Sequence, residues 1–154
     1  MNIREQVSNN LLALLNTATF DTPINNQSTW ANIGSLQRRL KSFDDVPPSA
    51  QPSLYLVGSD EEAVQQGRGI PVKRVINFWV VCYCRAEVGD IGDTYLNIMQ
   101  TAIENSIFPS PSSDGVQTIG GLVYKCWIKG KILRDPGDLD NQAMLIVPIE
   151  VTIP

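Results

Sequence analysis

Histidine is missing from this chain of 154 residues. Its absence removes the usual general base, the Ser-His-Asp and Cys-His arrangements and the common zinc sites. A phosphate-binding loop is missing as well, because the glycine clusters at 67–69 and 120–121 lack the Lys-Ser/Thr pair and the strand-turn-helix setting of such loops. Both clusters are interpreted as turns. The sequence therefore predicts no catalytic residue, no cofactor and no enzyme.

Dense runs of lysine or arginine are also missing, and the formal net charge is −4. The basic footprint of a nucleic-acid-binding protein is therefore absent, and no sequence-specific nucleic acid is expected as a partner. No apolar run approaches the length that spans a membrane. Residues 1–16 carry an early acid and several polar residues, unlike a signal peptide. We expect a cytoplasmic product with no membrane partner.

Cysteine is scarce, with Cys82, Cys84 and Cys126 as the three examples. An odd count without a secretion signal argues against a disulfide framework. Cys82 and Cys84 share one face of a predicted strand, which would suit a metal, but neither a second pair nor a histidine completes a tetrahedral site. All three are predicted to be buried thiols.

The most informative stretch is the final quarter, where residues 120–153 form two long apolar runs joined by an acidic turn. Met144 and Ile146 make the second face of the last run apolar at its start. A strand with two apolar faces is rarely half in water, and so short a chain has few helices to cover it. The surplus is interpreted as an assembly surface. The first face of this run carries Ala143, Leu145, Val147, Ile149, Val151 and Ile153.

Two stretches show helical spacing. Apolar residues recur at this spacing from Ile3 to Leu15, which predicts an amphipathic helix that ends near Asn16. A second helix is predicted after Asp93, whose side chain is placed as an N-cap. The expected buried stripe of this helix consists of Tyr95, Leu96, Met99, Ala102 and Ile103.

Strand patterns fill much of the remaining chain. Residues 72–85 are apolar on both faces, which predicts a central strand, and 54–57 and 30–40 are shorter candidates. The acidic and then glycine-punctuated stretch predicts a mobile hairpin loop at about 59–70, which we expect to become ordered on docking. Pro148 lacks a backbone N–H, which restricts it to a sheet edge or a bulge.

The order of these elements predicts an α+β fold with a mainly antiparallel sheet of four or five strands and two helices packed on one face. Strand and helix alternate only once, which disfavours a doubly wound parallel sheet. A chain of this length buries roughly 70% of its unfolded surface in one core, so residues 1–154 are expected to form a single domain.

The acidic turn contains Asp135, Asp138 and Asp140 around Pro136-Gly137. Three aspartates at this spacing could ligate calcium, but no bidentate glutamate follows at the expected distance, so no metal site is predicted. Aspartates also flank turns because their side chains bond local backbone amides. The turn is either a solvated hairpin or a charged contact with an adjoining subunit.

Lys125, Trp127, Lys129 and Lys131 are predicted to share one face of their strand. This face is either a solvent face with an aromatic lid or a basic stripe that meets acidic loops on a neighbour. Trp79 and Trp127 would also suit ligand stacking, although an aromatic residue in a long strand belongs more often to a core or an interface.

Two pairs of adjacent acids, Asp44-Asp45 and Glu61-Glu62, invite comparison with the paired carboxylates of glycoside hydrolases. Adjacent residues of an extended chain point apart, however. Both pairs are interpreted as solvated charges.

Several short sequences together carry a family resemblance through their order and spacing. From about residue 30 to the C-terminus the chain resembles the tail terminator proteins of tailed bacteriophages, whereas the first helix is generic. The sequences that carry the resemblance are RRL at 38–40, DVPP at 45–48, QP at 51–52, GRGIP at 67–71, GGLVYKCWI at 120–128 and DPGD at 135–138.

The resemblance implies a subunit of a homo-hexameric ring that settles on the tail tube protein, ends tube growth and offers a surface to neck or head-completion proteins. It implies a place in the virion tail, after assembly in the bacterial cytoplasm, with DNA passing through the ring lumen. The candidate residues for contacts with other subunits, the tube or the neck are Arg38, Arg39, Asp44, Asp45, Glu61, Glu62, Arg68, Lys125, Trp127, Lys129, Lys131, Arg134, Asp135, Asp138 and Asp140.

Alternative hypotheses stay open. Another ring-forming neck or head-tail joining protein would share a small α+β subunit without catalytic residues. A small-molecule binding module would instead use Trp79 or Trp127, and an enzyme with an acid-only site is a third class.

Overall fold

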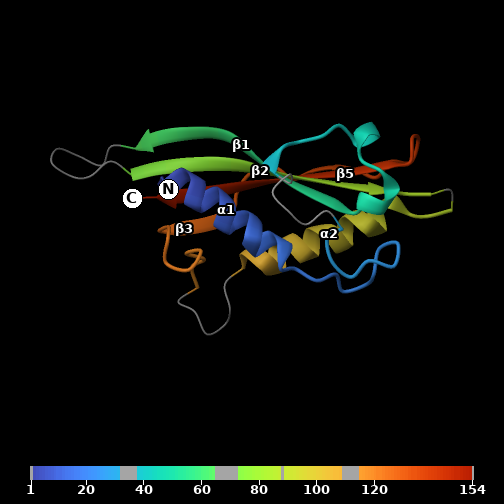
Figure 1. Ribbon diagram of the computed structural model, residues 1–154, viewed down its shortest axis with the longest axis horizontal. Helices are drawn as coiled ribbons and strands as arrows, with labels where there is room; N and C mark the ends of the chain where they lie inside the picture. Colours follow the sequence, from blue (N-terminus) through green and yellow to red (C-terminus); the bar gives the residue numbers. More distant parts are fainter. Residues whose placement is uncertain (1, 32–37, 65–72, 88, 109–114, 154) are drawn as a thin grey trace.

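The computed structural model describes residues 2–31, 38–64, 73–87, 89–108 and 115–153. Two α-helices lie on one side of a five-stranded antiparallel sheet (Figure 1). The strand order is β1-β2-β5-β3, and β4 also pairs with β5. This arrangement confirms the predicted α+β fold. The elements are α1 (Ile3–Asn16), β1 (Ser53–Val64), β2 (Lys73–Arg85), α2 (Gly92–Ile107), β3 (Lys125–Ile128), β4 (Leu133–Asp135) and β5 (Gln142–Ile153).

The helix-facing side of the sheet carries the main core. Every second residue of β5 from Ala143 to Ile153 is buried, as the alternation of the sequence predicts. Each fully buried aliphatic side chain contributes roughly 1.5–3 kcal/mol, so this layer dominates the stability of the fold. The helices cover it with Val7, Leu11, Leu12 and Leu15 from α1 and with Leu96, Met99, Ala102, Ile103 and Ile107 from α2.

The opposite side of the sheet, here called the outer face, is covered over only part of its length. Two short 3₁₀ turns, η2 (Phe43–Asp45) and η3 (Pro48–Ala50), belong to the segment that packs on this side of the sheet. The hydroxyl of Tyr83 donates a hydrogen bond to the carbonyl of Lys41 at 2.8 Å, which ties this segment to β2. Burial raises the pKa of Tyr83, so this hydroxyl stays a donor.

A second, smaller core forms beneath that segment. Val46 packs there with Tyr55, Val81 and Tyr83, and Met144 and Ile146 are half-buried against them. The prediction that Met144 and Ile146 form surplus assembly surface is therefore wrong. The segment at 38–52, which contains no α-helix and no strand, covers them. The prediction considered only helices as cover and therefore missed this segment.

Both helices begin close to their predicted positions, but the second is capped differently. Asn2 caps α1 by accepting a hydrogen bond from the amide of Glu5 at 2.9 Å. The N-cap of α2 is Ile91 and not Asp93, which lies in the first turn. Asp93 binds Arg134 at 2.9 Å there, so its carboxylate is used for a tertiary contact in place of a cap.

The first strand is longer than its apolar run. Residues 59–64 continue β1 opposite β2, with a register shift between Gly58 and Glu61, so the predicted loop at 59–70 is wrong for this part. Residues 65–72, including Arg68, lie outside the described residues. Within the candidate strand at 30–40, the described residues 30, 31 and 38–40 are not in a strand.

The penultimate strand is interrupted. In place of one long run, β3 pairs with residues 149–152 of β5 and β4 pairs with 144–146. On one side, Pro148 of β5 faces the gap between β3 and β4, and on the other side it pairs with Trp79 of β2. Pro148 is therefore in an interior strand and not at a sheet edge. Its carbonyl accepts from the amide of Lys129 at 3.2 Å. Because the N and the C=O of a strand residue point to the same side, its missing N–H faces the interruption.

Candidate assembly surfaces

The first candidate surface is the part of the outer face that the 38–52 segment leaves uncovered, here called the open half-face. Trp79 of β2 and Trp127 of β3 are its large apolar side chains, and they are 49% and 39% exposed. Trp79 lies opposite Val57 and Pro148, and Trp127 lies opposite Glu150. The open half-face consists of Asn77, Trp79, Lys125, Trp127, Pro148, Glu150 and Thr152.

Trp127 is held in place by charged neighbours. Its indole N–H donates to Oε1 of Glu150 at 3.0 Å, and Lys129 pairs with Oε2 of the same carboxylate at 3.2 Å. The ammonium of Lys125 lies 3.5 Å from the ring centroid, a cation–π contact worth roughly 0.5–1 kcal/mol at an exposed site. These contacts together favour one orientation of the ring.

The predicted basic stripe is shorter than expected, because β3 ends at Ile128. Lys129 and Lys131 follow the strand and do not belong to it, so the expectation of one shared strand face is wrong for them. Lys125 and Lys129 still converge on Trp127. Lys131 is exposed in the connection to β4.

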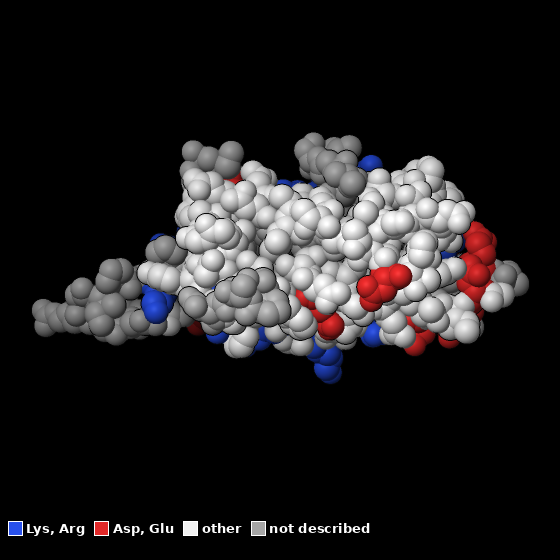
Figure 2. Space-filling model, turned by 90° about the horizontal axis from the view of Figure 1, so that it is seen from below, with Lys and Arg blue, Asp and Glu red and all other residues white. Residues whose placement is uncertain are grey.

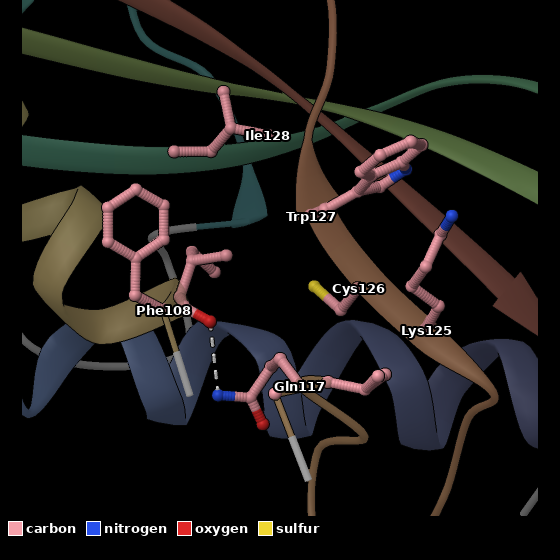
Figure 3. Close-up of a pocket in the computed structure, with 9 residues that line it drawn as sticks. Phe108, Gln117, Lys125, Cys126, Trp127 and Ile128 are labelled. Atoms are coloured by element: carbon pink, nitrogen blue, oxygen red, sulfur yellow. Dashed lines mark hydrogen bonds between the residues drawn. The ribbon is translucent and has the colours of Figure 1, made fainter. Parts of the chain in front are cut away.

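A second surface is a cavity of about 250 Å³ beside β3, at the edge of the sheet, here called the edge pocket. It lies between the end of α2, the segment 115–117 and β3. Phe108 and Val116 line it and are 57% and 41% exposed. Cys126 and Ile128 point toward Phe108, whereas Lys125 and Trp127 point to the other side of the strand (Figure 3). The pocket is therefore mainly apolar and open to solvent.

Two hydrogen bonds of Gln117 join the walls of this pocket. Its side chain donates to the carbonyl of Ile107 at 3.3 Å (Figure 3), and its backbone carbonyl accepts from the amide of Cys126 at 2.9 Å. One glutamine thus joins the end of α2 to the edge of β3.

All three cysteines are free and buried, as predicted. Burial raises the pKa of Cys84 and of Cys126 to about 12, and it raises the pKa of Cys82 well above its usual value. Their thiolates are not populated near neutral pH, so none is an activated nucleophile there.

A third surface is the acidic end of the molecule, where residues 86, 87 and 89–91 and the loop at 135–141 lie. Figure 2 shows acidic side chains gathered at this end of the helix-bearing face. The loop before β5, here called the acidic loop (residues 135–141), is tightly bonded: Asp135 accepts from the amide of Gly137 at 3.0 Å and Asp140 from that of Gln142 at 3.0 Å. Leu139 is fully exposed at 102% between Asp138 and Asp140.

Several predicted contact residues have partners within the molecule. Arg38 binds Glu5 at 2.7 Å and Asn9 at 3.1 Å on α1, and Glu61 accepts from Arg4 at 3.0 Å. Arg134 donates to Asp93, Asn97 and Gln100 of α2. Asp44 accepts a hydrogen bond from Gln142, and Asp45 accepts one from Ser42. Arg39 and Glu62 are exposed to solvent.

The sequence did not single out Leu139, Phe108 or Val116, which are the exposed apolar residues of two of these surfaces. A leucine between two aspartates in a turn is the one signal that the sequence offered, because nothing local can bury it. Phe108 and Val116 follow a helix and precede a short strand, and their exposure depends on tertiary packing.

Among the described residues, no cluster of three or more acidic or cysteine side chains could hold a metal ion, and no helix is long and apolar enough to cross a membrane. Comparison of the chain with protein-family models and with curated proteins finds no match.

Proposed function

We propose that this protein is a structural subunit that forms a ring on the phage tail tube, ends tube growth and provides the attachment surface for neck or head-completion proteins. The sequence resemblance suggests this role. The observation that best supports it is the presence of two unlike exposed surfaces at opposite ends of the sheet. The aromatic open half-face with its lysines lies at one end, and the acidic loop with Leu139 lies at the other.

Two unlike surfaces favour contacts between the head of one copy and the tail of the next. Such heterologous contacts close into a ring when the rotation per subunit permits it. Opposite charges on the two surfaces steer the encounter and fix its register. The expected ring is a hexamer in the virion tail, assembled in the host cytoplasm, with DNA passing through its lumen.

The mechanism needs no catalytic group. A ring seated on the last ring of the tube covers the surface on which the next tube subunits would add, and it presents a different surface to the neck. Trp79 and Trp127 are suited to the central contacts of such an interface, because tryptophan is enriched at binding hot spots.

The test has two parts. Light scattering after gel filtration gives the oligomeric state, and we expect a ring-sized species at high concentration. Electron microscopy of tails assembled without this protein gives tail length, and we expect overlong tubes. Tails of normal length that fail to join heads would instead show a neck or head-tail joining protein.

A small-molecule binding module is the second candidate, because the edge pocket is apolar and open. A monomer at every concentration, together with saturable binding of a small apolar ligand, would favour this module over the ring. Trp79 and Trp127, the residues first considered for ligand stacking, do not face each other across that pocket, since Trp127 points away from it (Figure 3).

A further inference from the structure

We infer that the acidic loop of one copy docks on the open half-face of the next copy. Leu139 packs there against Trp79 and Trp127. The carboxylate of Asp138 then lies beside Lys125. The occupant of the open half-face is therefore a second copy of this chain. The inference deepens the proposed function and rests on it for its biological role, whereas the contact itself is tested separately.

The centre of the open half-face is a row of apolar rings. Pro148 of β5 pairs with Trp79 of β2, and Trp127 of β3 pairs with Glu150, two residues further along β5. Because residues two apart on a strand share a face, the three rings lie on one side of the sheet. Both indoles are exposed, and Pro148 lies half-buried on the strand between theirs. The row therefore offers a seat for an apolar side chain of a partner.

One positive charge on this face has no carboxylate partner. The ammonium of Lys125 lies 3.5 Å from the centroid of the Trp127 ring, and none of the ion pairs among the described residues includes it. Lys129, in contrast, is paired with Glu150, so these two charges largely cancel. A carboxylate that arrives at the β3 side of the seat therefore meets Lys125.

The acidic loop carries the two matching groups. Leu139 is fully exposed, and Asp138 beside it is exposed and takes part in none of the ion pairs among the described residues. The carboxylates of Asp135 and Asp140 are already used, since each accepts a hydrogen bond from a nearby backbone amide. An exposed apolar side chain next to an unpaired carboxylate is the complement of an apolar seat next to an unpaired lysine.

Contacts within the loop hold these groups in place. The amide of Asn141 donates to the carbonyl of Gly137 at 2.8 Å, which closes the loop around Leu139. A Cβ added at Gly137 would lie 2.6 Å from the carbonyl carbon of Gln142, so the loop packs backbone against backbone on the start of β5. Because its own contacts already order the loop, less conformational entropy is lost when it docks.

Acidic residues on the β1 side of the face set the orientation. Asp60 accepts a hydrogen bond from Asn77. Glu62 pairs with Val75, which shares its face of β2 with Asn77. Like charges there repel Asp138, whereas Lys125 on the β3 side attracts it. The loop is therefore expected to dock with its free carboxylate toward β3.

The contact cannot form within one molecule. The acidic loop ends just before Gln142, the first residue of β5, whereas the open half-face lies beside the later residues from Pro148 to Thr152. At about 3.3 Å per strand residue, the two sites are roughly 20–30 Å apart. The contact therefore joins two copies head to tail, as the proposed ring requires.

Mixing two disabled proteins tests the contact. Leu139→Ser damages the loop and leaves the face intact, whereas Trp79→Ser damages the face and leaves the loop intact. In sedimentation velocity, each protein alone is expected to associate about tenfold more weakly than the wild type. An equimolar mixture is expected to form a heterodimer and no larger species, because one intact loop meets one intact face. A contact that uses the same surface of both copies would give no such rescue.

Two further proteins keep the result decisive. Leu40→Ser is the matched control, since Leu40 is another exposed leucine and lies outside both surfaces, and it should associate as the wild type does. Circular dichroism shows whether each variant is folded, and Lys125→Glu replaces Trp79→Ser as the face variant if the latter is not. The inference is overturned if the mixture associates no better than its components, if Leu139→Ser behaves as Leu40→Ser does, or if the wild type stays a monomer at every concentration.

Tail length separates this inference from the proposed function. If the heterodimer forms as expected but tails assembled without the protein are of normal length, the contact stands and the terminating role fails. If tubes become overlong without the protein but Leu139→Ser protein associates with unchanged affinity, the role stands and the contact is refuted.

Discussion

Arg134 is the residue whose role the structure changes most. Its guanidinium donates to Oδ1 of Asp93 at 2.9 Å, Asn97 at 2.6 Å and Gln100 at 2.8 Å, three residues on one side of α2. The sequence placed Arg134 at an interface because it neighbours an acidic turn. In the fold it joins β4, a strand of three residues, to the helix beneath the sheet.

Replacing Arg134 by alanine is expected to lower the free energy of unfolding by about 1–3 kcal/mol, because several hydrogen bonds to a charged donor are lost together. Urea unfolding followed by tryptophan fluorescence measures the change. Lys131→Ala, an exposed basic residue in the preceding connection, is the matched control and is expected to stay within about 0.5 kcal/mol of the wild type. Equal stabilities of the two variants would contradict the role of Arg134 as a clamp.

The ion pair of Glu5 and Arg38 makes a pH-dependent contribution to the stability of the fold. The hydrogen bond and the charge of Arg38 lower the pKa of Glu5 from its usual value of 4.5. The ionised carboxylate therefore stabilises the fold, and this contribution is present above the pKa of the unfolded chain and is lost as the pH falls through the folded pKa.

Replacing Arg38 by alanine is expected to raise the pKa of Glu5 toward 4.5, as an NMR titration of its carboxyl carbon would show. The stability difference from the wild type should shrink as the pH falls below that value, and it should be small because the pair is exposed to solvent. Arg39→Ala is the neighbouring control. An unchanged pKa in the Arg38 variant would refute the coupling.

At the scale of single residues, the sequence predicted which side chains are buried better than it predicted which side chains bond to each other. The three cysteines and the alternating residues of β5 are buried as expected, because hydrophobic alternation is local information. The clamp of Arg134 and the exposure of Leu139 depend on residues distant in sequence. No local pattern contains them.

Among the elements, β1 shows how charge misleads a strand prediction. Asp60, Glu61 and Glu62 were interpreted as loop residues, yet they lie in an edge strand. Charged side chains are common there because they discourage pairing with other sheets. Contacts from Asn77 to Asp60 and from Arg4 to Glu61 hold this part of the strand on both faces.

The start of α2 depends on a close approach between two elements. A Cβ added at Gly92 would lie 1.8 Å from the carbonyl oxygen of Pro136, the residue that begins the turn of the acidic loop. Helix and loop therefore pack backbone against backbone. The orientation of the acidic loop, and with it that of Leu139, depends on this glycine.

Gly92→Ala is expected to destabilise the protein by about 1–3 kcal/mol, because the added methyl group must displace backbone. Thermal unfolding by circular dichroism measures the change. Gly58→Ala is the matched control, since nothing lies within 4 Å of its added Cβ, and it should be close to neutral. A neutral Gly92 variant would show that the loop moves freely from the helix.

For the whole molecule, the sequence predicted a sheet with more apolar surface than two helices cover. It placed the uncovered surface at the wrong residues. Met144 and Ile146 are covered by the segment that contains Phe43 and Val46. The large apolar side chains that stay exposed lie elsewhere, at Trp79, Trp127 and Leu139 among others. Irregular segments carry no period, so their place over a sheet cannot be derived from hydrophobic patterns.

In the proposed ring, the acidic loop of one copy meets the open half-face of the next copy, where the ammonium of Lys125 lies over Trp127. Exchanging charges across that contact tests it. Asp138 has no hydrogen bond or ion pair with another described residue, and it adjoins Leu139. Asp138→Lys places it against Lys125 of the next copy, and Lys125→Glu places like charges together in the same way.

Each single substitution is expected to weaken self-association about five- to tenfold, as sedimentation velocity at low salt would measure. The double variant should recover most of the wild-type affinity, because opposite charges face each other again. Added salt should reduce the differences between these proteins. Lys41→Glu, at an exposed lysine beside the covered part of the outer face, should associate as the wild type does. If the two single effects simply add in the double variant, Asp138 and Lys125 do not meet, and the acidic loop of one copy does not contact the open half-face of the next.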